Sequence, residues 1–325
     1  ADLAMVLARY DKNISGTKGL ALFLLPKRLN SGKFNSYEII RLKDKLGGRS
    51  FASGESKLKK AQAYMVEEQK KELTNKVDEI KFAEWDIEVP KYKVKDKEWL
   101  KSQVSRAFLP KYFPNYEKYL WIDCDAWVND WESIELYFKA CDYGKLGITQ
   151  TIGPGYKITS KVNWLIGKLA IIKSQNFKHA VKSKIVYENA RKLAFAPHIN
   201  IGVFSLEKNS NGWSCWQNNL TKTLKAGNIF GSEGLAINMA VYIDDLETEF
   251  LPLKCNWITS NLLPKYDEKQ KTFVEPYLPN YKIGIVHLAA GIWKDGKDMR
   301  VDKSVQIEIE TLNNKKVTKS LRFSG

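Results

Sequence analysis

The chain has 325 residues, of which 44% are hydrophobic and 12% aromatic, and its formal net charge is +15. This apolar content excludes a disordered protein, and the absence of any run of roughly 18 consecutive apolar residues excludes a membrane-spanning helix. The four cysteines are scattered without CxxC spacing, which excludes a zinc finger or a dense disulfide framework and favours the reducing cytoplasm.

Residues 1–56 alternate apolar stretches with turn-forming residues, which predicts a β-meander. The phrases ADLAMVLAR, GTKGLALFLLPK and KLGGRSFASGE resemble the middle β-domain of acyl-CoA dehydrogenases. Enzymes of that family also need a helical domain on each side and a catalytic carboxylate, and nothing after Ser56 resembles these parts. The resemblance therefore implies a fragment of that domain joined to an unrelated one.

Residues 57–76 are charged and lack glycine and proline, which predicts a helical linker. From residue 77 to residue 299 the strand and helix signals alternate, which predicts an α/β domain. The expected strands lie at 77–89 (a strand pair), 119–123, 147–151, 199–206, 250–252 and 283–287. The expected helices lie at 96–109, 131–141, 162–172, 181–194, 212–226 and 232–241. Residues 300–325 read as a polar C-terminal tail with a weak strand pattern at 304–309.

Two carboxylates stand where an apolar strand ends, in the phrase YLWIDCDAWV. Asp123 and Asp125 are two positions apart, so in an extended chain both side chains point to the same side. Ligands of open α/β sheets collect at the carboxyl ends of strands, and two hard oxygen ligands suit a divalent cation that also contacts phosphate. The alternative is a strand-ending turn whose acids are merely solvated.

His287 closes a second apolar strand, KIGIVHL, in the same way. It is followed by the small-residue loop AAG and then by Trp293 and Lys294. A lone histidine is usually a structural residue, but this one ends a strand as the two acids do.

Five phrases now stand in order along the chain: YLWIDCDAWV, NIGVFSLEK, GSEGLAIN, LPLKCNW and HLAAGIWK. Together, over about residues 99–294, they resemble the GT-A-fold glycosyltransferases, especially family 8-like enzymes such as glycogenin and bacterial lipopolysaccharide sugar transferases. The resemblance implies a GT-A-like (Rossmann-like) mixed sheet flanked by helices. It also implies a hexosyltransferase that moves a sugar from a nucleotide diphosphate sugar, with a UDP-sugar as the expected donor, to an acceptor hydroxyl with retention of configuration.

Carried over position by position, the resemblance makes Asp123, Asp125 and His287 the ligands of Mn²⁺ or Mg²⁺. An imidazole nitrogen among oxygen ligands favours Mn²⁺. Arg106 and Lys294 resemble the basic residues that hold the diphosphate of the donor.

A second group of residues is implied to contact the donor sugar or to orient the acceptor, which could be a glycan, a lipid-linked sugar or a protein. These residues are Asn200, Glu233 and Asn238, and their alternative reading is as polar residues of a strand edge or helix cap. Three departures from the family pattern stand out. Gly234 occupies a position where the family usually has Gln, and the spacing from His287 to Lys294 is one residue longer than the family pattern implies. The dehydrogenase-like segment stands where the first strand–helix unit of the nucleotide pocket should precede Val77.

Two other classes remain open. An apolar strand followed by DxD also opens aspartyl-phosphate phosphohydrolases, with Asp123 as nucleophile, Asp125 as acid-base and Asp244 and Asp245 as metal ligands. The bulky Trp127 counts against this class. The third class is a non-catalytic fusion or fragment with a broken nucleotide pocket.

The net positive charge favours anionic partners. No RNP-like, zinc-finger or helix-turn-helix pattern supports nucleic acid. We therefore expect a cytoplasmic protein that does not bind nucleic acid and whose basic surface is compatible with peripheral contact to a membrane.

Overall fold

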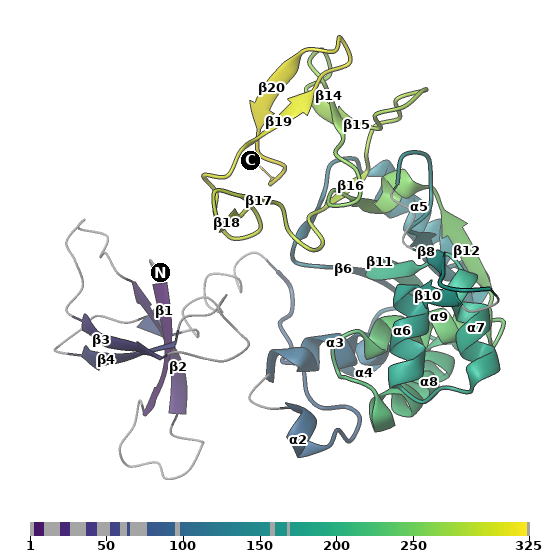
Figure 1. Ribbon diagram of the computed structural model, residues 1–325, viewed down its shortest axis with the longest axis horizontal. Coiled ribbons are helices and arrows are strands. Elements are labelled where there is room, and N and C mark those ends of the chain that lie inside the picture. Colours follow the sequence, from purple (N-terminus) through teal and green to yellow (C-terminus); the bar gives the residue numbers. More distant parts are fainter. Residues whose placement is uncertain are drawn as a thin grey trace. The chain divides into compact units, whose positions relative to one another are not determined.

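The computed structural model describes residues 77–94, 98–156, 160–167 and 170–323, together with the backbone of five strands before residue 66. Contacts divide the chain into two compact units, Ala1–Phe82 and Ala83–Gly325 (Figure 1). Among the described residues, none of the helices combines the length and the apolar character needed to cross a bilayer.

The first unit contains antiparallel strands. β1 pairs with β2 and β2 with β5, while β3 pairs with β4. Strands were expected in residues 1–56, but a meander would pair β2 with β3, and these two strands belong to separate sheets. The strands are β1 (Leu3–Arg9), β2 (Leu20–Pro26), β3 (Tyr37–Lys43), β4 (Ser53–Leu58) and β5 (Tyr64–Met65). β4 and β5 enter the segment 57–76, where a helix was expected. The rest of that segment, 59–63 and 66–76, lies outside the described residues.

The second unit is built on a mixed four-stranded sheet in the order β12-β8-β11-β6. Its strands are β6 (Lys118–Ile122), β8 (Leu146–Gln150), β11 (Ile199–Glu207) and β12 (Thr248–Leu251). β12 runs parallel to β8, and the other neighbours are antiparallel. The α/β prediction for this region, with a mixed sheet and flanking helices, is confirmed at that level of detail.

Helices cover both faces of this sheet (Figure 1). In β11, Phe204 packs into the core formed with α8 (Gly212–Ala226) and α9 (Ser232–Tyr242), whereas its neighbour Val203 packs into the core formed with α5 (Glu132–Ala140). Successive side chains of a strand point to opposite faces, so a strand buried on both sides must be apolar throughout. This explains the apolar run IGVF in the middle of β11.

A small second sheet, in the order β13-β16-β7, lies next to α5 and completes the part of the fold that matters for function. Its strands are β7 (Ala126–Val128), β13 (Trp257–Ile258) and β16 (Ile285–His287). β16 pairs antiparallel with β7 so that His287 stands opposite Ala126. This register brings the end of β16 beside the β6–β7 connection, although 160 residues separate the two in sequence.

The remaining elements surround these layers. The other helices are α2 (Lys91–Val94), η2 (Glu98–Leu100), α3 (Lys101–Ser105), η3 (Arg106–Phe108), α4 (Leu109–Tyr112), η4 (Asp142–Gly144), α6 (Gln175–Lys182), α7 (Tyr187–Phe195) and η5 (Leu253–Asn256). The other strands are β9 (Lys161–Trp164), β10 (Ala170–Lys173), β14 (Lys265–Asp267), β15 (Thr272–Val274), β17 (Trp293–Lys294), β18 (Lys297–Asp298), β19 (Ile307–Glu310) and β20 (Lys316–Lys319).

Several expected elements differ in the structure. The helix expected at 162–172 is wrong, because these residues form the β9–β10 hairpin, whose turn includes Gly167 at φ 57°. The helix expected at 181–194 is interrupted at Lys184, which has φ 54°, so that α6 and α7 are separate. Residues 77–89 contain no regular strand. The strand pattern expected at 304–309 corresponds to β19, which pairs with β20.

Candidate metal centre

Asp123 and Asp125 lie in the short connection between β6 and β7, between the two sheets. The amide of Asp123 donates to the carbonyl of Gly202 in β11 at 2.8 Å, and the carbonyl of Asp125 accepts from the amide of Leu288 at 2.9 Å. A turn closes between the carbonyl of Asp123 and the amide of Ala126 at 2.9 Å. The backbone of both acids is therefore held by neighbouring strands, so their positions are determined by the fold.

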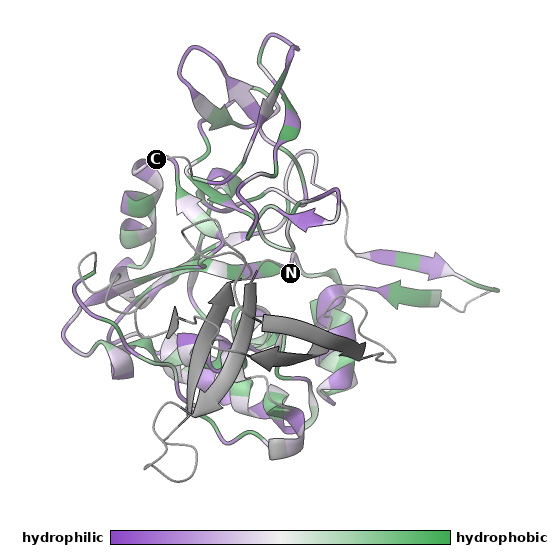
Figure 2. Ribbon diagram, turned by 90° about the vertical axis from the view of Figure 1, so that its left-hand side faces the viewer, coloured by the Kyte–Doolittle hydropathy of each residue, from purple (hydrophilic) through white to green (hydrophobic). Residues whose placement is uncertain are grey.

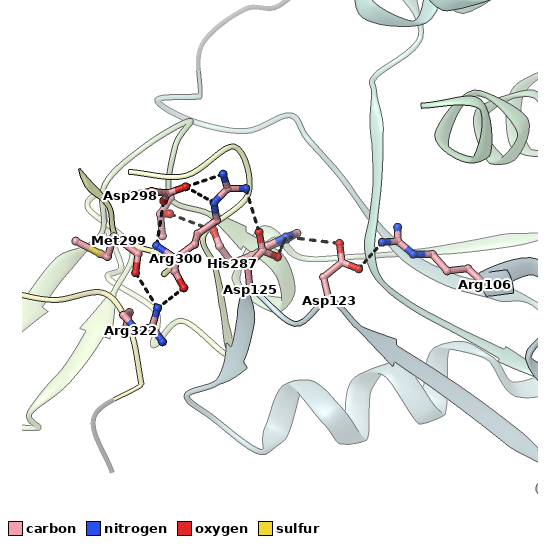
Figure 3. Close-up of polar contacts among 9 residues, drawn as sticks. Arg106, Asp123, Asp125, His287, Asp298, Met299, Arg300 and Arg322 are labelled. Atoms are coloured by element: carbon pink, nitrogen blue, oxygen red, sulfur yellow. Dashed lines mark hydrogen bonds and ion pairs between the residues drawn. The ribbon is translucent and has the colours of Figure 1, made fainter. Parts of the chain in front are cut away.

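Three side chains converge at this point. Nε2 of His287 lies 3.2 Å from Oδ1 of Asp125 and 3.9 Å from Oδ2 of Asp123 (Figure 3). One ligand atom from each residue lies within 4.8 Å of the others. Two ligands of one divalent ion, at bonds of about 2.1 Å, lie about 3 Å apart when adjacent and about 4 Å apart when opposite. The distances of 3.2 and 3.9 Å from Nε2 of His287 to the two acids lie in this range, so this donor set can hold a single divalent cation.

A chain of side-chain amides orients His287, whose exposed fraction is 1%. Oδ1 of Asn200 accepts from the backbone amide of Gly202 at 2.9 Å and from Nδ2 of Asn256 at 3.2 Å. A backbone amide only donates, so this atom of Asn200 is an oxygen, and Asn256 turns its NH₂ toward it. The oxygen of Asn256 then faces Nδ1 of His287, at 2.8 Å.

This arrangement sets the tautomer of the imidazole. Because Oδ1 of Asn256 can only accept, Nδ1 of His287 carries the hydrogen, and the lone pair of the neutral ring lies on Nε2, toward the two acids. A lone pair facing a carboxylate oxygen at 3.2 Å is repulsive unless a cation or a proton lies between them. This donor set is therefore suited to a metal ion.

Gly202 makes the close approach of these groups possible. A Cβ at this position would lie 2.2 Å from Cε1 of His287 and 2.9 Å from both Oδ1 of Asn200 and Oδ2 of Asp123. Contacts of this length do not occur between real Cβ atoms and their neighbours, so any larger residue would displace the ligands. The glycine of the NIGV phrase is thus explained by packing against the centre.

Arg106 holds Asp123 from one side (Figure 3). Its Nη2 lies 2.7 Å from Oδ1 of Asp123, and the same oxygen accepts from Nε1 of Trp121 at 2.7 Å. The guanidinium also lies over the Trp121 ring, 5.1 Å from its centroid. With Oδ1 occupied by these two donors, Oδ2 is the oxygen left for His287 and a metal.

Arg300 approaches Asp125 from the opposite side (Figure 3). Its Nη1 lies 3.8 Å from Oδ2 of Asp125, and its Nε and Nη2 donate to Oδ2 of Asp298 at 2.9 and 2.7 Å. Burial raises the pKa of Asp125, but a hydrogen bond and a positive charge from His287, both of which require a proton on Nε2, together with the charge of Arg300 outweigh it, so the pKa is lowered overall. A cation in place of that proton acts in the same direction. Asp125 is therefore held as a carboxylate.

The centre lies in a cleft with a volume of about 630 Å³. Arg106, Arg300, Asn200 and Glu233 also line this cleft. Glu233 is 6% exposed and accepts from the amide of Gly231 at 3.1 Å. Burial raises the pKa of its carboxyl, against the lowering effect of the Arg106 charge.

Two residues expected at the site lie elsewhere. Lys294 is exposed on β17 and donates to the carbonyl of Gln306 at 2.8 Å, and it does not line the cleft. Asn238 is fully buried. Its side-chain Nδ2 donates to the backbone carbonyl of Gly234 at 2.7 Å, and its Oδ1 accepts from the backbone N–H of Ile199 at 3.1 Å. The second of these bonds links α9 to β11.

The structure also reveals cleft residues that sequence reasoning missed. Arg300 belongs to a segment read as a polar tail, and only its pairing with Asp298 two positions earlier could have drawn attention to it. His179 and His198 line the wall of the cleft formed by α6 and the start of β11. Nδ1 of His198 lies 2.7 Å from Oδ1 of Asn176.

The acids Asp244 and Asp245 line a separate cavity of about 500 Å³, together with residues such as Cys215. Oδ2 of Asp244 accepts from the side-chain amide of Asn219. Neither acid lines the cleft of Asp123.

Comparisons with known proteins add one partial match. The acyl-CoA dehydrogenase family member 11 of Caenorhabditis elegans is 41% identical over 73 residues, which are 21% of this chain and 12% of that protein. It bears the name of the family that residues 1–56 resemble. No family model matches the chain, and no solved structure matches it.

Proposed function

We propose that the second unit, Ala83–Gly325, is a metal-dependent glycosyltransferase of GT-A-like fold, which transfers a sugar from a nucleotide diphosphate sugar to an acceptor hydroxyl. The observation that carries the proposal is the convergence of Asp123, Asp125 and His287 within 4.8 Å of one another at a cleft of about 630 Å³. The ordered resemblance of five phrases to family 8-like enzymes supports the same reading.

The donor set favours Mn²⁺ over Mg²⁺, because an imidazole nitrogen joins two carboxylates. When bound, the cation would supply the positive charge that stabilises a departing diphosphate. The residues of this chain would hold it: Asn256 presents the free nitrogen of His287, and Arg106 turns Oδ2 of Asp123 toward the site.

Arg300 takes the place that the resemblance gave to Lys294. Its side chain is 35% exposed and lines the cleft beside Asp125, so a guanidinium can donate to phosphate oxygens there. Arg106 is more buried, with an exposed side-chain fraction of 11%, and we assign it to positioning Asp123. Glu233, at the same cleft, is the residue proposed to bond a sugar hydroxyl.

The phosphohydrolase alternative needs Asp244 and Asp245 at the metal centre, and both line another cavity. One observation does favour a non-catalytic protein. β6 stands at the edge of the four-stranded sheet, and among the described residues no strand–helix unit continues the sheet beyond it on the side where a nucleotide-binding unit would add. A protein of this kind would bind metal without turning over nucleotide sugars.

One experiment separates these functions. The full chain is incubated with Mn²⁺ and a panel of UDP- and GDP-sugars, and nucleotide release is compared for the wild type, Asp125→Ala and the control Asp245→Asn. We expect release that Asp125→Ala abolishes and Asp245→Asn preserves. Mn²⁺ binding without release would identify the non-catalytic alternative, and phosphate release from a phosphoester would identify the hydrolase.

A further inference from the structure

The β9–β10 hairpin stands away from the rest of the second unit and is seen projecting to the right in Figure 2. Five large apolar side chains of the hairpin are exposed to solvent. Their exposed fractions are 39% for Val162, 69% for Trp164, 60% for Leu165, 81% for Ile166 and 46% for Ile171. Single exposed apolar residues are ordinary, but Val162, Trp164, Leu165 and Ile166 lie within five consecutive positions, and a group of this kind marks an interaction site.

The strand register divides the hairpin into two faces. Trp164 pairs with Ala170 and Val162 with Ile172, so these four side chains share one face, which is wholly apolar. Lys161 pairs with Lys173 and Asn163 with Ile171 on the other face. Leu165 and Ile166 follow Trp164 in the turn. The hairpin is therefore amphipathic, with an apolar face and turn and two exposed lysines at its base.

The segment of sequence that contains the hairpin carries charge of a single sign. Between Asp142 and Glu188 the sequence contains no acidic residue and eight lysines. Lys161 and Lys173 of the hairpin and Lys178 and Lys182 of α6 belong to this stretch. A partner of this surface must therefore be anionic, and it must also accept exposed Trp, Leu and Ile side chains.

We propose that the β9–β10 hairpin docks the protein on the surface of an anionic lipid bilayer. The apolar turn would enter the boundary between headgroups and acyl chains, where tryptophan is favoured, and the lysines at the base would meet the negative headgroups. A second copy of the chain fits less well, because two hairpins packed together would bring like charges into contact. This inference does not depend on the proposed function.

Docking there has a consequence for the cleft. β10 ends at Lys173 and α6 begins at Gln175, and Gln175, Asn176 and His179 of α6 line the cleft. The wall that carries these residues is thus continuous in sequence with the docking hairpin. Docking through the hairpin would therefore bring this wall of the cleft near the membrane surface.

The test is co-sedimentation of the full chain with vesicles of phosphatidylcholine alone and of phosphatidylcholine with 30% phosphatidylglycerol (about the anionic content that gives a cytoplasmic-leaflet potential). We expect binding to the anionic vesicles that weakens at high salt. Leu165→Ser with Ile166→Ser should weaken binding by about tenfold or more, because each side chain loses its burial in lipid. Lys161→Gln with Lys173→Gln should weaken it by about fivefold for each charge removed.

The matched control is Trp131→Ala compared with Trp164→Ala. Trp131 is 66% exposed at the start of α5, so it has the same side chain and a similar exposure outside the hairpin. Only Trp164→Ala should reduce binding, and both variants should keep the wild-type melting temperature. The proposal is overturned if wild type ignores anionic vesicles, if both tryptophan variants bind equally, or if the serine variant instead converts a dimer to a monomer.

Discussion

Oδ1 of Asn256 lies 2.8 Å from Nδ1 of His287, and both side chains are 1% exposed. This contact decides which imidazole nitrogen is free for a metal, because the ring must donate from Nδ1 and keep its lone pair on Nε2. His287 therefore depends on Asn256 to present Nε2 to an ion.

Removing that contact should weaken metal binding without removing a ligand. We expect Asn256→Leu to lower the affinity for Mn²⁺ by about 10- to 100-fold, measured by calorimetric titration of the folded protein. The control is Asn129→Leu, which removes a partly buried amide bonded to the carbonyl of Ile283 at 2.6 Å, away from the centre. Equal Mn²⁺ affinity in both variants would show that Asn256 has no positioning role.

A pair of glycines gives a second prediction. Gly202→Ala places its Cβ 2.2 Å from the His287 ring, so it should abolish Mn²⁺ binding and destabilise the fold by about 1–3 kcal/mol. Gly234→Ala in α9 meets nothing within 4 Å and should stabilise the protein by about 0.5–1 kcal/mol, because alanine favours a helix over glycine. Chemical denaturation measures the change in the free energy of unfolding of both variants. A change of the same sign in the two variants would contradict the packing argument.

Arg300 and Lys294 differ in their distance from the proposed diphosphate site rather than in charge. Arg300→Met should weaken the binding of UDP in the presence of Mn²⁺ by about tenfold or more, since it removes charge-assisted hydrogen bonds at the cleft. Lys294→Met removes the same charge from an exposed strand and should leave the Kd nearly unchanged. Reversal of this order would restore the role that the resemblance assigned to Lys294.

His198 makes stability depend on pH. Burial lowers its pKa to about 4, whereas the unfolded chain has an ordinary histidine pKa of about 6.5. Between these values the unfolded state binds more protons, so the free energy of unfolding falls as the pH drops from about 6.5 to about 4, by up to about 3 kcal/mol. His198→Gln should flatten this part of the stability profile relative to wild type. An unchanged slope would show that His198 is not the group responsible.

The sequence by itself determined the local features of the centre. Asp123 and Asp125 share one side because an extended chain repeats every two residues, and the apolar runs of β6, β8 and β11 indicated buried strands of an α/β unit. The same local reasoning failed at 162–172. A short apolar run of this kind fits a helix or a strand equally well, and pairing across the turn at Gly167 decided for the hairpin.

Only the tertiary structure decided which distant residues complete the site. The β7–β16 register places His287 beside the acids, and the loop before β19 brings Arg300 to Asp125. Asn238 and Lys294, both expected at the cleft, are drawn into the α9–β11 contact and onto an exposed strand instead. Such placements depend on long-range strand pairing and core packing, and no spacing along the chain encodes them.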